Sequence, residues 1–76
     1  MPPGMRLLEE EERLGLLASL LRSKRDAEAT LQALPFNLET ISQRKYKKSV
    51  EARLLDVENA IRIFSQRKVL VQADGL

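Results

Sequence analysis

The apolar residues in the second half of the chain recur at alternating intervals of four and three. They are Val50, Leu54, Val57, Ile61 and Phe64. This alternation puts all of them on one side of an α-helix that lies along a second helix. A β-strand would need apolar residues at every second position, and the charged residues between these five do not follow that pattern. Because one amphipathic helix of this length is only marginally stable in water, a partner helix must cover this side.

A leucine-rich stretch before Pro35 supplies the partner helix, which we predict over residues 9–33. Consecutive glutamates at 9–12 open it, where the positive end of the helix dipole favours negative charge. Gly15 lies inside this helix at a cost of about 1 kcal/mol relative to alanine, so it is either simply tolerated or needed for the close approach of a partner backbone. The predicted seam of this helix consists of Leu14, Leu17 and Leu21, with Leu16 and Leu20 beside it.

Pro35 ends the first helix, because proline has no backbone N–H to donate and its ring clashes with the preceding turn. Thr40 with Gln43 three residues later is typical of a capping box. A second helix is therefore predicted over residues 41–67. The connection between the helices, residues 34–40, is short, which makes the two helices antiparallel.

The predicted fold is all-α: an antiparallel, coiled-coil-like hairpin of two helices with a short extended C-terminal tail. With the turn near Asn37, residue i of the first helix faces about residue 74 − i of the second. The hairpin occupies residues 7–71 of a single domain, between a flexible leader at 1–6 and a flexible tail at 72–76. The apolar run 69–71 is predicted to be extended and to dock on the helices. The predicted hairpin core is Leu14, Leu17, Leu21, Val50, Leu54, Val57, Ile61 and Phe64.

The composition excludes several classes of function. The chain has no cysteine and no histidine, which excludes disulfides and metal sites built on those residues. Its serines are scattered over helical patterns without a nucleophile elbow or a glycine-rich loop, so we predict no catalytic residues and no cofactor. There is no apolar run of about 18 residues to span a membrane, and the first residues lack the apolar core of a secretory signal. We therefore predict a non-enzymatic protein of a reducing intracellular compartment.

The strongest functional signal is a run of four positive charges within residues 44–48. They fall in the first two turns of the second helix, where the helix dipole disfavours cations. The antiparallel arrangement brings three basic residues of the first helix toward the same end. Such a cluster is either a solvated face or, as we favour, a salt-sensitive docking surface for an acidic partner. Nucleic acid is disfavoured, because only Tyr46 is available to stack on bases. The predicted partner-binding residues are Arg44, Lys45, Lys47, Lys48, Arg22, Lys24 and Arg25.

A second signal is apolar surface that the hairpin seam does not use. A two-helix hairpin buries one stripe of each helix, so apolar residues off that stripe remain partly exposed. Three interpretations stay open: ordinary surface leucine covered by the run 69–71, a homodimer that forms a four-helix bundle, or docking into a larger assembly. The residues concerned are Leu16, Leu20, Leu55 and Ile63.

Several short motifs follow one another along the chain. They are Glu10-Glu11-Glu12-Arg13, Leu34-Pro35-Phe36, Glu39-Thr40, the stretch 51–61, Phe64-Ser65 and Lys68-Val69-Leu70-Val71. In this order, and with the basic stretch between them, they resemble the C-terminal domain of enkurin and enkurin-domain proteins over about residues 7–71. The first helix lacks the Ser or Thr cap usual in that family, and the proline-rich N-terminal region of full-length enkurin is absent from this sequence.

The resemblance implies a structural module of a ciliary or flagellar protein that binds tubulin or neighbouring proteins in axonemal doublet microtubules. The localisation it implies is cytoplasmic, in the cytoskeleton of the axoneme. An alternative that it also implies is an adaptor for calmodulin or TRPC-type channels. No IQ-type motif is complete, but a basic amphipathic helix at 41–55 suits a calmodulin groove, although the hairpin itself uses Val50 and Leu54. A self-associating helical bundle is the third alternative.

Overall fold

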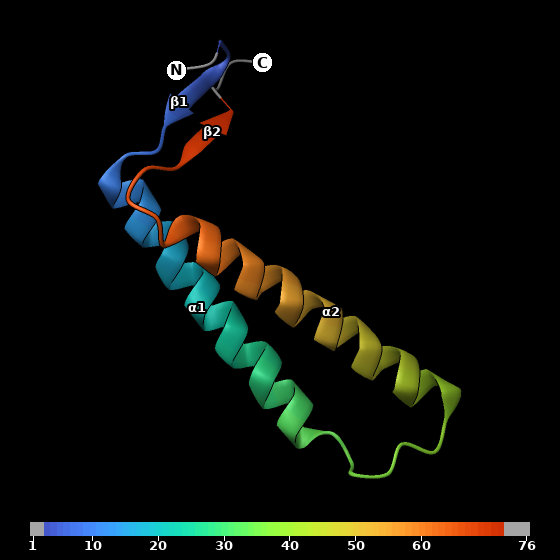
Figure 1. Ribbon diagram of the computed structural model, residues 1–76. Helices are drawn as coiled ribbons and strands as arrows, with labels where there is room; N and C mark the ends of the chain where they lie inside the picture. The colour runs from blue at the N-terminus through green and yellow to red at the C-terminus, as the bar shows by residue number, and fades with distance from the viewer. Residues whose placement is uncertain (1–2, 73–76) are drawn as a thin grey trace.

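The computed structural model describes residues 3–72, which form a rod-shaped helical hairpin (Figure 1). In chain order its elements are β1 (Met5–Leu7), α1 (Glu10–Ala33), α2 (Ile41–Phe64) and β2 (Leu70–Gln72). The molecule measures 51 × 22 × 18 Å, and its radius of gyration is 16.5 Å. A compact domain of this length would have a radius of gyration of about 11 Å. The two helices run antiparallel and pack side by side, which confirms the predicted all-α hairpin.

The helix ends follow from local sequence. Leu34 adopts an extended conformation before Pro35 and ends α1. Thr40 forms the predicted capping box: its Oγ1 accepts from the Gln43 backbone N–H at 3.0 Å, and Gln43 Oε1 accepts from the Thr40 N–H at 3.2 Å. At the start of α1, Glu9 occupies the cap position without a side-chain hydrogen bond to the helix.

The second helix ends at Phe64, three residues before the predicted end at residue 67. Both the backbone N–H and the hydroxyl of Ser65 donate to the Ile61 carbonyl oxygen, at 2.9 and 2.6 Å. The Gln66 N–H then bonds the Ile63 carbonyl at 3.2 Å, which tightens the last turn. Because the Ser65 side chain competes for a helical carbonyl, the helix stops there.

The side of α1 that faces α2 differs from the predicted seam. Leu14 and Leu21 are 51% and 43% exposed, so their assignment to the hairpin core is wrong, whereas Leu17 is half-buried. Leu20, which was predicted to lie outside the seam, is also half-buried. The buried and half-buried positions again follow intervals of four and three. They are Arg13, Leu17, Leu20, Lys24, Ala27 and Leu31, and Thr30 beside this series is half-buried as well.

The most buried contact of the interface, at its end nearest the connecting loop, explains this choice of seam. Val50 of α2 is 1% exposed and Ala27 of α1 is 3% exposed. A small residue opposite a branched one lets the two helices approach closely, and this fixes which stripe of α1 faces α2. The other positions of α2 that are at least half-buried are Leu54, Val57, Ala60, Ile61 and Phe64.

The register of the hairpin places residue i level with residue 77 − i. Met5 pairs with Gln72 and Leu7 with Leu70, and the Arg13 side chain bonds the backbone of Phe64. This register differs by three residues from the predicted 74 − i. The midpoint of this register falls between Leu38 and Glu39 rather than at Asn37, although residues 34–40 connect the helices as predicted.

The open end of the hairpin is closed by a two-stranded antiparallel ribbon, drawn at the top of Figure 1. Next to the ribbon, the Leu8 N–H donates a hydrogen bond to the Val69 carbonyl oxygen at 2.8 Å, and both residues are buried. The prediction of a flexible segment is therefore wrong at Met5, Arg6 and Gln72, which lie in these strands. Because the helices are antiparallel, the segment after α2 lies beside the segment before α1, and the two segments pair as β2 and β1. Of the remaining residues that were predicted to be flexible, Pro3 and Gly4 form a turn before β1, and those at 1–2 and 73–76 lie outside the described residues.

Candidate interaction surface

The first part of α2 extends beyond its contact with α1. Every residue from 41 to 49 is exposed, and burial begins at Val50. Figure 1 shows the two helices closest beside the strands and diverging toward the connecting loop. In the register of the hairpin, Ile41 is level with Phe36 of the loop, so no helix lies opposite the first turn of α2. We call residues 34–49 the tip of the hairpin.

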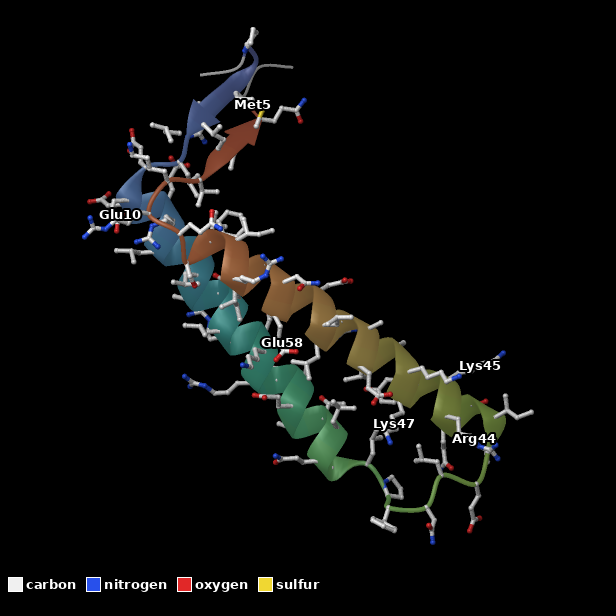
Figure 2. The ribbon with its side chains drawn as sticks, viewed as in Figure 1. Met5, Glu10, Arg44, Lys45, Lys47 and Glu58 are labelled. Atoms are coloured by element: carbon white, nitrogen blue, oxygen red, sulfur yellow. The ribbon has the colours of Figure 1, made fainter. Side chains whose placement is uncertain are left out.

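The basic run covers about half of the circumference of the tip part of α2. Figure 2 shows Lys45 on the outer side of this helix and Lys47 on the side toward α1. Successive residues are rotated by about 100°, so four cations within five positions cannot share one face. Within residues 3–72, Lys45, Lys47 and Lys48 form no ion pair, while Arg44 donates from Nη2 to the Glu39 carbonyl at 3.3 Å. The charge of the lysines is therefore available to a partner.

The three predicted basic residues of α1 lie farther from the tip than expected. Arg25 is level with Ala52, about 6 Å along the axis from Lys48. Lys24 is half-buried, and its Nζ lies 3.7 Å from Glu58 Oε2 of α2. Arg22 donates to the Ser19 hydroxyl at 3.2 Å. The predicted cluster of seven is thus drawn out along the hairpin, and Lys24 serves the contact between the helices.

Exposed apolar side chains accompany the basic residues at the tip. Phe36 in the loop is fully exposed and Ile41 is 69% exposed, while Tyr46 is 52% exposed. Leu55, at 60%, lies fourteen positions after Ile41, which places the two within about 40° of each other around α2. Phe36 was not predicted to belong to a binding surface, and Ile41 was predicted only as the first residue of the amphipathic stretch 41–55. The sequence feature that indicates their exposure is their position on either side of the start of the second helix, before the first residue of its apolar seam, Val50.

The opposite end of the hairpin holds a buried cation, Arg13, which was not among the predicted core or partner-binding residues. Arg13 donates from Nε and Nη2 to the Glu10 carboxylate and from Nη1 to the Phe64 carbonyl oxygen. The hydrogen bond from Arg13, with a smaller contribution from Arg67, holds the pKa of Glu10 below its ordinary value. Hydrogen bonding to Glu10 in turn raises the pKa of Arg13. The spacing of Glu10 and Arg13 is the sequence signal for this pair.

The described residues offer surfaces rather than enclosed sites. Residues 3–72 contain no cavity and no group of three or more acidic side chains that could hold a metal ion. Neither α1 nor α2 has the length and apolar character that crossing a membrane requires, within the described part of the chain. The arrangement is suited to binding another macromolecule along the rod.

Comparison with known proteins agrees with the resemblance drawn from the motifs. A family model described as "Enkurin: Calmodulin-binding" matches residues 2–68. Enkurin domain-containing protein 1 of Bos taurus is 36% identical over 75 residues, covering 99% of this chain and 22% of the bovine protein. The proteins of the same name from Mus musculus and Homo sapiens are each 35% identical over 97% of this chain. No solved structure matches the chain.

The chain spans about a fifth of the length of these curated relatives. The family is described by a binding property and not by a reaction, which fits a hairpin whose exposed features are charge and apolar side chains. The chain belongs to the enkurin family, and its hairpin is an interaction module.

Proposed function

We propose that the hairpin binds calmodulin through the outer side of α2 between Ile41 and Leu55. The observation that carries this proposal is the exposure of every residue from 41 to 49, which leaves a basic stretch of helix without a partner in the hairpin. The family description names calmodulin binding and supports the same partner. Basic amphipathic helices are the usual targets of the calmodulin groove.

The binding face follows from helix geometry. Ile41 and Leu55 point away from α1, and Arg44, Lys45 and Lys48 fall within about 60° of Ile41 around the helix axis. Val50 and Leu54 face α1 on the opposite side, at least half-buried. The outer face therefore offers two apolar anchors about 21 Å apart, with cations between them, and the hairpin need not open for binding. Calmodulin and α1 therefore do not compete for Val50 and Leu54, as the sequence alone suggested they would.

Calorimetric titration of calmodulin into the 76-residue chain, with calcium and then with a calcium chelator, tests the proposal. The variant Ile41→Ser/Leu55→Ser should bind at least tenfold more weakly, as should Arg44→Glu/Lys45→Glu/Lys48→Glu. Arg53→Glu/Arg62→Glu/Lys68→Glu reverses the same number of charges, one off this side of α2 and two beyond residue 55, and should bind like the parent chain. Unchanged affinity in both face variants, or no binding by the parent chain, would refute the proposal.

A second candidate is tubulin or a neighbouring protein in axonemal doublet microtubules, in the cytoskeleton of a cilium or flagellum. The feature that favours it is the distribution of charge around α2, with Lys45 and Lys47 on different sides (Figure 2). A groove engages one face of a helix, whereas a helix lodged among acidic surfaces is contacted from several directions. Under this function Lys47, which lies off the calmodulin face, contributes to binding as well.

Co-sedimentation with microtubules at low and high salt separates the two functions. Lys47→Glu should weaken sedimentation without changing calmodulin affinity, because Lys47 contributes only to the tubulin surface. Sedimentation by the parent chain should fall steeply with added salt. Sedimentation that is unaffected when Arg44, Lys45, Lys47 and Lys48 are all replaced by Glu would exclude an electrostatic tubulin site.

A further inference from the structure

A second stripe of α1 repeats the spacing of a helix-packing seam but faces away from α2. Its members are three, four, three and four residues apart, and all of them are exposed. They are Glu11, Leu14, Ala18, Leu21 and Arg25. Leu14 and Leu21 are among the exposed large apolar residues of the hairpin. We call these five residues the outer seam of α1.

The outer seam lies on a flank of the rod. Leu14 is rotated by about 100° from Arg13, whose side chain reaches α2. The intervals of the outer seam are those of a coiled-coil interface, with an apolar centre and one charge at each end. Among residues 3–72, neither Glu11 nor Arg25 takes part in an ion pair. The outer seam therefore has the spacing, the apolar centre and the unpaired end charges of a helix-packing surface, and no other described part of the hairpin covers it.

We propose that this partner is a second copy of the same chain, packed antiparallel along the outer seam. The seam is self-complementary about Ala18. An antiparallel second helix places Leu14 beside Leu21 of the other copy, and Leu21 beside its Leu14. It also places Glu11 beside Arg25 of the other copy at both ends of the contact. A two-fold axis requires such reciprocal pairs.

The small side chain at the centre and the charges fix the orientation. Ala18 of each copy lies at the two-fold axis, where it allows the helices to approach closely. A parallel pair would bring Glu11 against Glu11 and Arg25 against Arg25, which like-charge repulsion disfavours. The interface is short and includes four leucines from the two copies. It therefore belongs to the weak class of interfaces, whose assembly depends on concentration.

Self-association of this kind has a consequence beyond the binding of a single partner. Antiparallel α1 helices point the two basic tips toward opposite ends of the four-helix assembly. The dimer is then bivalent and can hold two partner molecules apart or engage one extended partner twice. The outer seam and the calmodulin-binding side of α2 share no residue, so substitutions can abolish self-association or calmodulin binding separately.

A charge-swap experiment by sedimentation equilibrium tests the pairing. The parent chain should dimerise as its concentration rises. Glu11→Arg and Arg25→Glu should each remain monomeric, because each places like charges opposite one another. An equimolar mixture of the two variants should recover the dimer, since each charge of one then faces its opposite on the other. Helicity measured by circular dichroism should stay that of the parent chain in both.

A disulfide trap tests the position of the axis. The chain has no cysteine, so Ala18→Cys introduces a single thiol. Two copies of this thiol at the axis should cross-link under mild oxidation, because their Cα atoms lie within the roughly 7 Å that a disulfide spans. Asn59→Cys, on the outer side of α2, should cross-link far less.

Three results would overturn the proposal. The parent chain could remain monomeric at the highest soluble concentration. The mixed charge variants could fail to associate although each is folded. Dimers could survive Leu14→Ser/Leu21→Ser and be lost with Leu55→Ser/Ile63→Ser, which would assign the contact to α2 instead.

Discussion

Arg13 Nη1 donates a hydrogen bond to the Phe64 carbonyl oxygen at 3.0 Å and so joins the first turn of α1 to the last turn of α2. The carbonyl is one of those that a helix leaves without a partner at its C-terminal end, where the dipole attracts positive charge. The Arg13 side chain is buried, and Glu10 neutralises it through hydrogen bonds from Nε and Nη2. One side chain therefore caps α2 and fixes the register of the hairpin.

Replacing Arg13 should weaken the hairpin at its strand end. Arg13→Ala leaves the Phe64 carbonyl and the Glu10 carboxylate without their donors, and we expect the midpoint of thermal unfolding to fall by several degrees. Arg22→Ala removes an arginine whose bond to Ser19 is local and exposed, and it should change the midpoint little. Equal midpoints for the two variants in thermal melts followed by circular dichroism would contradict this role of Arg13.

Stability should decrease in acid because of two glutamates at the start of α1. Hydrogen bonds from Arg13 and Arg6 hold the pKa values of Glu10 and Glu12, respectively, below their ordinary value of 4.5. A carboxyl whose pKa is lower in the folded state stabilises the fold above the unfolded-state pKa. That contribution is lost as the pH falls below about 4.5 and through the folded-state pKa.

Urea unfolding between pH 7 and pH 3 checks this pH dependence. Glu10→Gln/Glu12→Gln should flatten the acid side of the stability profile, because the titrating groups are gone. Glu11→Gln is the matched control on the same turn and, with all three chains measured at low concentration where they are monomeric, should leave the profile unchanged. An acid side that is equally steep in all three chains would show that other carboxyls cause it.

The phase of the α1 seam predicts unequal losses of stability when apolar side chains are truncated. Val50→Ala should cost about 2 kcal/mol of unfolding free energy, since it empties the most buried position of the interface. Leu14→Ala, measured at low concentration, should cost less than about 0.5 kcal/mol, because its side chain is half exposed on the flank. If Leu14→Ala lost more unfolding free energy than Val50→Ala in urea titrations, the seam predicted from the sequence, with Leu14 in the core, would be correct.

The capping box at Thr40 should contribute measurably to the stability of α2. Thr40→Ala removes the acceptor of the Gln43 N–H and should cost about 1 kcal/mol. Thr40→Ser keeps the hydroxyl and should retain most of that free energy. Ser42→Ala alters a neighbouring hydroxyl that does not cap the helix, so it serves as the control. If alanine at position 40 leaves the urea midpoint unchanged, the box is dispensable.

Two glycines should respond in opposite directions to alanine. A Cβ added at Gly15 meets no atom within 4 Å, so Gly15→Ala should stabilise α1 by about 1 kcal/mol. This open space favours simple tolerance of Gly15 over close approach of another backbone. Gly4 has φ of 79°, and Gly4→Ala should destabilise the chain by about 1 kcal/mol, because L-residues disfavour that conformation. Thermal melts of the two variants beside the parent chain provide the measurement.

Local signals in the sequence determined most of the fold. Pro35 stops one helix, Thr40 and Gln43 start the next, and the short connection leaves no arrangement but an antiparallel hairpin. The run from Val50 to Phe64 shows which side of α2 must be covered, because only one series of apolar residues follows the helical intervals there. The basic charge of the tip is equally visible, since it is a run of adjacent residues.

Only the tertiary structure decided which stripe of α1 meets α2. Two series on α1 follow the same intervals, one through Leu17 and Ala27 and the other through Leu14 and Leu21. Their spacing is identical, so the choice depends on how closely the opposite helix can approach, which is a property of the pair. The hydrogen bond from Arg13 to Phe64 and the strand pairing of Met5 with Gln72 could not be predicted from the sequence either. Each joins residues far apart in the chain, and neither partner alone carries a pattern that identifies the other.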